Sequence, residues 1–160
     1  MTEAGTGRRD PENEPVVVDT MLFGALLTRA STRKKELFYK YRIHLIGKPV
    51  VLAFVTVAEL RYGAYKAGWG STRLNDLEER FREVQIVMPD NDLVETCARL
   101  RLSCERVGHP LHEKLHEADR WIAATAIRYG IALVSDDVIF RNTPGLRLLQ
   151  ESDPHVTNRW

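Results

Sequence analysis

The chain has 160 residues, of which 44% are hydrophobic and 28% charged, with a formal net charge of +1 at pH 7. That length supports one domain with a real core and is too short for two comfortable ones, and the composition is that of an ordinary globular protein. No apolar run approaches the roughly 20 residues that cross a bilayer, and the N-terminus has no apolar signal-peptide region. We therefore expect a cytoplasmic protein without a membrane partner.

The strand and helix patterns alternate along most of the chain. Residues 1–15 are polar and rich in Gly and Pro, which predicts a flexible N-terminal tail before a domain over 16–150 and a C-terminal tail over 151–160. Strand patterns are expected at 16–18, 49–55, 83–88, 131–135 and 146–149, with helices at 20–30, 32–46, 56–68, 72–82, 91–108 and 115–126. This order predicts an α/β fold with a mostly parallel sheet flanked by helices and ligand sites at the carboxyl ends of strands.

Two features bear on environment and partners. Cys97 and Cys104 fall on one helical pattern about 10 Å apart along its axis, too far for a disulfide, so we expect buried thiols in a reducing cytosol. Residues 29–66 hold nine Lys and Arg against two acids, a local charge of +7 that leaves −6 on the rest of the chain. The basic segment suggests a polyanion such as nucleic acid, with a solvated helix face as the alternative.

Several acids follow strand patterns or begin helices, and each has a structural explanation. Asp19 ends the first strand and is suited to an N-cap. Glu59 lies three residues after Thr56, the spacing of a capping box. Asp136 and Asp137 follow the strand pattern 131–135, where acids are ordinary turn residues.

Asp119 has no such explanation in the sequence. In the segment LHEADRWIAATA it falls on the helix face that carries Leu115, Ile122 and Ala126. A carboxylate in an apolar stripe costs several kcal/mol unless it is protonated, hydrogen-bonded or bound to a cation. If these acids converge, their repulsion calls for a cation, and hard oxygen ligands suit Mg²⁺ or Mn²⁺ at a site that acts on phosphates.

Four segments carry a resemblance to a known family: VVVDT, VTVAELRYGA, HEADRWIAATAIRYG and LVSDDVIF. In order and spacing they are similar to the PIN-domain nucleases, in particular the VapC-type toxins of bacterial toxin–antitoxin pairs, over residues 16 to about 150. The resemblance implies an acidic metal site formed by Asp19, Glu59, Asp119 and Asp137. Ser135 would lie beside it, with Asp136 as the alternative to Asp137 because SDD offers two acids.

The resemblance also implies a function. We expect an endoribonuclease that uses Mg²⁺, or Mn²⁺ as a substitute, to activate water for RNA hydrolysis. It would be the toxin of a type II toxin–antitoxin system, a homodimer with a cognate antitoxin protein, and the basic stretch 29–48 would hold the RNA backbone.

Other functions remain open. HEKLH places His112, Glu113 and His116 in the HExxH pattern of zinc hydrolases, but Asp119 and Ile122 stand where a metzincin would continue with Gly and His. A Mg²⁺-dependent phosphatase would need a second acid two residues after Asp19, where the chain has Met21. A non-catalytic RNA-binding protein would not need the acids aligned.

Overall fold

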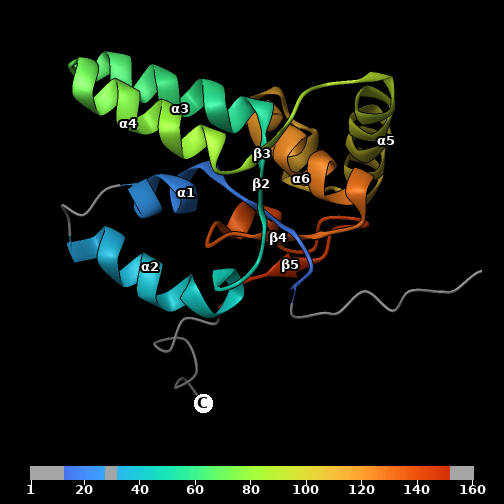
Figure 1. The fold of residues 1–160 in the computed structure, drawn as a ribbon. Helices are drawn as coiled ribbons and strands as arrows, with labels where there is room; N and C mark the ends of the chain where they lie inside the picture. The colour runs from blue at the N-terminus through green and yellow to red at the C-terminus, as the bar shows by residue number, and fades with distance from the viewer. Residues whose placement is uncertain (1–12, 28–31, 152–160) are drawn as a thin grey trace, which may run out of the picture.

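A five-stranded sheet in which every neighbouring pair is parallel forms the centre of the protein. The computed structural model describes residues 13–27 and 32–151. The strand order is β3-β2-β1-β4-β5. The strands are β1 (Val16–Val18), β2 (Val50–Ala53), β3 (Gln85–Val87), β4 (Ala132–Val134) and β5 (Leu148–Leu149). The expected α/β fold with a parallel sheet is confirmed (Figure 1).

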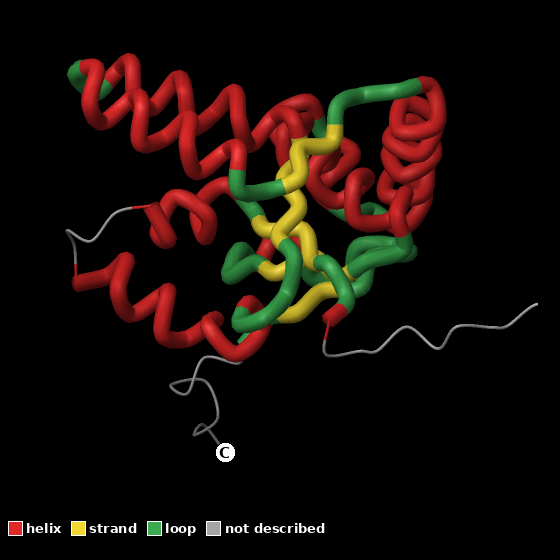
Figure 2. The backbone as a smooth tube through the Cα atoms, in the orientation of Figure 1, coloured by secondary structure: helices red, strands yellow, loops and turns green. Residues whose placement is uncertain are grey.

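Helices cover both faces of the sheet. They are α1 (Thr20–Leu27), α2 (Thr32–Leu45), α3 (Phe54–Lys66), α4 (Ser71–Arg82), α5 (Asn91–Val107) and α6 (Glu117–Tyr129). Between α5 and α6 lie two short 3₁₀ turns, η2 (Pro110–His112) and η3 (Lys114–His116), and η4 (Val138–Phe140) lies between β4 and β5. Figure 2 shows the strands running between the two groups of helices.

The alternation of side chains along each strand divides the interior into two cores. Val17 packs with the buried faces of α5 and α6, whereas Val16 and Val18 pack with residues of α1 to α4. Successive strand residues point to opposite faces, so a strand buried on both faces must be apolar throughout. The unbroken VVV of β1 at the centre of the sheet meets that requirement.

The helix α5 follows its sequence signals closely. Asp90 accepts a hydrogen bond from the backbone N–H of Leu93 at 2.8 Å and caps the helix, and Gly108 ends it with a φ of 70°. Cys97 and Cys104 lie on its buried face as free thiols, as predicted.

The helix expected over 115–126 begins later than its pattern indicates. Leu115 is 83% exposed in η3, and α6 starts at Glu117. Arg120, only 4% exposed, donates to the carbonyl of Leu111 at 2.6 Å and to that of Glu113 at 3.2 Å. These bonds hold the preceding segment as two tight turns. Asp119 therefore lies in the first turn of α6, and the expected start of the helix at residue 115 is wrong.

The ends of the chain are only partly described. Glu14, in the expected N-terminal tail, forms an ion pair with Arg147 at 3.0 Å, and Glu151 begins the expected C-terminal tail. Residues 1–12, 152–160 and the expected helix end at 28–30 lie outside the described residues. In the part of the chain that the structure describes, no helix is long and apolar enough to cross a membrane.

Candidate active site

The strand order places one pair of strand ends at a topological switch point. The chain runs from β1 outward through β2 to β3 and then returns to the other side of β1 to form β4 and β5. Crevices at such a reversal, beyond the carboxyl ends of the strands, are the usual ligand sites of open parallel sheets. Asp19 directly follows β1 and Ser135 directly follows β4, so both residues stand at this point.

Asp19 uses both of its carboxylate oxygens. Oδ1 accepts a hydrogen bond from the backbone N–H of Leu22 at 2.9 Å, and Oδ2 accepts one from the hydroxyl of Ser135. The N-cap interpretation of Asp19 is therefore correct but incomplete, because the same side chain also joins β1 to β4. Asp19 is only 5% exposed, so a charge on its carboxylate is largely removed from water.

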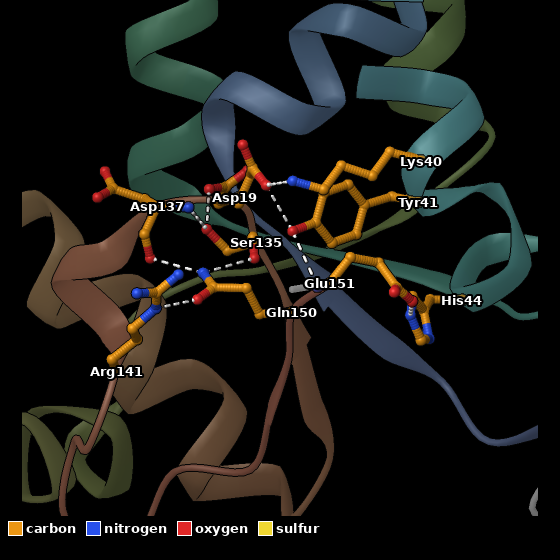
Figure 3. Close-up of polar contacts among 10 residues, drawn as sticks. Asp19, Lys40, Tyr41, His44, Ser135, Asp137, Arg141, Gln150 and Glu151 are labelled. Carbon is orange, nitrogen blue, oxygen red and sulfur yellow. Dashed lines mark hydrogen bonds and ion pairs between the residues drawn. The ribbon is translucent and has the colours of Figure 1, made fainter. Parts of the chain in front are cut away.

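Asp137 is oriented by the loop that follows β4. Its backbone N–H donates to the Ser135 hydroxyl at 3.0 Å, and its Oδ1 accepts from the N–H of Ile139 at 3.0 Å, which caps η4. Figure 3 shows Asp137 and Asp19 on either side of Ser135. The turn interpretation holds for Asp137, and the turn brings its carboxyl group to the switch point.

Asp136 makes a different set of contacts. Its Oδ1 accepts from Nζ of Lys40 at 2.8 Å and from the hydroxyl of Tyr41 at 2.6 Å, both on α2. Burial raises the pKa of Asp136, but the hydrogen bonds from Lys40 and Tyr41 outweigh it and hold the pKa below its usual value. The two neighbouring acids are therefore separated: Asp136 is bound to α2, and Asp137 interacts with Asp19.

Asp119 and Glu59 complete the acidic group from the flanking helices. Oδ2 of Asp119 lies 3.4 Å from Nδ1 of His116, and Glu59 accepts a hydrogen bond from the Thr20 hydroxyl at 2.5 Å. Burial raises the pKa of Asp119; the His116 contact opposes this rise, and the charges of Asp137 and Glu59 add to it. All four predicted acids therefore interact through space around the switch point.

The capping-box interpretation of Glu59 is wrong. The helix α3 begins at Phe54 with Ala53 as its N-cap, three residues earlier than Thr56, the N-cap that the Thr-x-x-Glu pattern requires. Thr56 is fully buried inside the helix, and the exposed Glu59 lies one turn further along. Its nearest hydrogen-bond donor is instead Thr20, the residue after Asp19.

The electrostatics of this group favour the binding of a cation. Burial raises the pKa of Asp19 to about 6, opposed by the hydrogen bonds from Ser135 and Leu22 and increased by the charges of Asp137 and Asp119. Carboxylate oxygens are the ligands that Mg²⁺ and Mn²⁺ prefer. No three His, Cys, Asp or Glu side chains among the described residues are already gathered closely enough to hold a metal ion. The acids fit a divalent cation in donor type and charge, and they would have to draw together to bind it.

The HEKLH segment does not have the geometry of a zinc hydrolase. That motif needs both histidines on one face of one helix, whereas here His112 ends η2, His116 ends η3 and the exposed Glu113 between them is extended, with a ψ of 148°. Nδ1 of His112 lies 2.7 Å from the carbonyl oxygen of His109, its hydrogen-bond partner.

The sequence did not predict four residues that support the site. Lys40, Tyr41 and Gln150 contact the segment 135–137, and Arg141 contacts Gln150. Gln150 donates to the carbonyls of Ser135 and Asp137 at 3.1 and 3.0 Å, and Arg141 donates to Gln150 (Figure 3). No motif marks these residues, and only their proximity in the fold identifies them.

Comparisons with known proteins agree with this architecture. The PIN domain family model matches residues 16–146. The fold is similar to a chain of VapBC2 from Rickettsia felis bound to a DNA fragment from their promoter, with a TM-score of 0.67 and 18% identity over 85% of this chain and 98% of that chain. It is also similar to a chain of DNA-bound VapBC from Salmonella typhimurium, with a TM-score of 0.66 and 20% identity over 85% of this chain and 97% of that chain.

A third structural relative is VapBC-5 from Mycobacterium tuberculosis, with a TM-score of 0.58 and 23% identity over 86% of this chain and 98% of that chain. A search of curated proteins gives no significant match. At these identities the structural likeness establishes the fold, and the family model covers most of the sequence. The chain therefore belongs to the PIN domain family.

Proposed function

We propose that this protein is a Mg²⁺-dependent endoribonuclease and the toxin of a type II toxin–antitoxin pair. The observation that carries the proposal is the meeting of Asp19, Ser135 and Asp137 at the switch point of a PIN domain, with Asp119 and Glu59 facing them. Interacting carboxylates at a strand end, two of which (Asp19 and Asp119) have a pKa raised by burial and by their neighbours' charges, are typical of a functional site. The similar VapBC structures support the toxin assignment.

The acidic residues have distinct tasks in this proposal. Asp19, Glu59, Asp119 and Asp137 would hold the ion, and Ser135 would keep the carboxylates of Asp19 and Asp137 in register through its two hydrogen bonds. When bound, Mg²⁺ supplies an activated water and neutralises charge on the scissile phosphate. Burial of Asp19 makes the site dependent on deprotonation, because a carboxylic acid is a poor metal ligand.

The substrate-binding part of the proposal rests on α2. Lys35 and Arg42 are exposed on this helix, and Tyr41 is buried beneath it with its hydroxyl on Asp136. Lys40 on the same helix is held against Asp136 at 2.8 Å, next to the acidic site. Lys35 and Arg42 would bind RNA phosphates without reading the bases. A cognate antitoxin that blocks the site belongs to the same proposal, supported by the VapBC structures among the similar folds. A homodimer belongs to it as well, as the family resemblance implies.

The test is cleavage of a single-stranded RNA by the purified full chain. We expect cleavage with Mg²⁺ or Mn²⁺, none in EDTA, and recovery when Mg²⁺ is returned. Asp19→Asn serves as the matched inactive control, because it changes one charge and little shape. Cleavage that persists in EDTA, or that Zn²⁺ restores and Mg²⁺ does not, contradicts the metal assignment. Equal cleavage of the matching DNA contradicts the assignment to RNA.

A further inference from the structure

Gln150 holds the loop that carries Asp137, although it lies beyond the residues 16–146 that match the PIN family model. It follows the last residue of β5, at the edge of the sheet. Its Nε2 donates to the carbonyl oxygen of Ser135 at 3.1 Å and to that of Asp137 at 3.0 Å. One side-chain amide therefore binds two backbone carbonyls on either side of Asp136.

The orientation of this amide is set by its remaining atom. Oε1 of Gln150 accepts a hydrogen bond from Nε of Arg141, so the NH₂ group must face the loop (Figure 3). An NH₂ group has two donors, and both are used here. The amide therefore acts as a clamp of fixed orientation.

Besides Gln150, the carbonyl of Asp137 accepts a longer hydrogen bond from the backbone N–H of Phe140, at 3.4 Å. On the inner side of the loop, the Asp137 N–H donates to the Ser135 hydroxyl, and that hydroxyl donates to Asp19. Gln150 thus fixes the outer side of the same short segment whose inner side orients two of the four acids. Movement of either carbonyl would rotate the adjoining peptide planes and shift the Asp137 carboxylate relative to Asp19.

We propose that Gln150 is a positioning residue for the metal site, which sets the Asp137 carboxylate through the backbone of residues 135–137. The inference rests on the proposed function, because it assigns Asp137 to that site. Residues that orient metal ligands typically change metal affinity or activity by about 10- to 100-fold when replaced. Gln150 itself touches neither substrate nor ion, so its effect should appear in Mg²⁺ affinity and kcat and leave RNA binding largely unchanged.

The decisive variant is Gln150→Met, which keeps the length of the side chain and removes both donors. We expect kcat to fall about 10- to 100-fold and Mg²⁺ to bind correspondingly more weakly by calorimetry. The KM for RNA should change by less than about twofold, because uniform substrate binding is untouched. In the metal-free protein, hydrogen exchange at the Asp137 amide should accelerate while α5 keeps its protection.

Glu151→Gln is the matched control. Its side chain lies 2.6 Å from His44, and only its backbone N–H, which the substitution retains, bonds Tyr41. This variant should keep wild-type kcat, Mg²⁺ affinity and exchange at Asp137. If Gln150→Met is too unstable to assay, Arg141→Ala provides a second variant. Arg141 is exposed, and its removal leaves the Gln150 amide free to turn. This variant should lower kcat and Mg²⁺ affinity and accelerate exchange at Asp137, each by less than Gln150→Met.

The measurements separate failure of this inference from failure of the proposed function. A wild type that cuts no RNA with Mg²⁺ contradicts the function, while Mg²⁺ affinity and hydrogen exchange still decide the positioning role. A Gln150→Met protein with wild-type Mg²⁺ affinity and wild-type exchange at Asp137 overturns the inference. It is also overturned if exchange rises uniformly over the whole domain, because that result shows general destabilisation.

Discussion

The hydroxyl of Ser135 donates a hydrogen bond to Oδ2 of Asp19 across a separation of 116 residues. This contact joins the carboxyl ends of β4 and β1, the two central neighbours at the switch point. It partly offsets the burial of the Asp19 carboxylate, yet the pKa of Asp19 still lies at about 6. The metal-free site therefore holds a charge that the fold does not fully stabilise.

Asp19 should make the metal-free protein less stable as the pH rises. Its pKa is about 6 in the fold and near 3.8 when unfolded, so between these values the folded state binds more protons and stability falls with rising pH. The protonated Asp19 thus contributes about 3 kcal/mol to the free energy of unfolding at low pH, and this contribution is fully lost above the folded pKa. Urea unfolding from about pH 4 to about pH 7 should show this loss in the wild type relative to Asp19→Asn. Parallel stability curves for the two proteins would contradict it.

Asp119→Asn should raise the metal-free melting temperature and abolish cleavage. The pKa of Asp119 is raised by burial and by the charges of Asp137 and Glu59, so a neutral side chain of the same shape relieves a cost. Mg²⁺ should raise the melting temperature of the wild type by mass action and that of the variant much less. A lower metal-free melting temperature together with an equal response to Mg²⁺ would remove Asp119 from the metal site.

Asp136 and Asp137 should respond oppositely to neutralisation. Asp137→Asn should lose cleavage and keep the fold, whereas Asp136→Asn should keep cleavage and lose stability, because its pKa is held low by Lys40 and Tyr41. Tyr41→Phe, which removes the hydroxyl from the same contact, should lower the free energy of unfolding by about 1–3 kcal/mol. If Asp136→Asn is inactive but stable, the assignment of the two acids is reversed.

Glu59→Gln tests whether an exposed acid belongs to the site. It caps no helix, so the free energy of unfolding should change by no more than about 0.5 kcal/mol. Cleavage should fall by more than about 10-fold, since a neutral amide replaces a carboxylate that would bind the metal near Asp119. RNA cleavage rates and chemical denaturation of the same preparation measure both effects. Full activity would exclude Glu59 from the site.

Reversal of charge at Lys35 and Arg42 should weaken binding to all RNA sequences alike. Both side chains are exposed on α2. For single strands, each lost phosphate contact reduces the slope of log binding constant against log salt concentration by about 0.7. Filter binding at several salt concentrations, with an inactive Asp19→Asn background in all samples, gives the slope. An unchanged slope would show that these charges form only a solvated helix face.

The sequence by itself determined the order of the elements and predicted that helices cover both faces of the sheet, whereas the four candidate acids came from the resemblance to the PIN family. These properties depend on local patterns: the unbroken apolar run of β1, the cap at Asp90 and Gly108 at the end of α5 are short-range features. A parallel α/β order also places strand ends on one edge of the sheet, which is why Asp19 and Asp137 could be grouped from the sequence.

Only the tertiary structure decided which contacts each acid makes. Asp136 and Asp137 are adjacent in sequence, and the partner that separates them, Tyr41, lies 95 residues from Asp136. The late start of α6 depends on the Arg120 side chain, which bonds carbonyls of the preceding turns, and the helical pattern contains no sign of it. Gln150 likewise carries no motif, because its role arises when β5 pairs beside β4 and brings its amide to the loop. Such contacts follow from the packing of distant segments, whereas local periodicity records only which face of each element is buried.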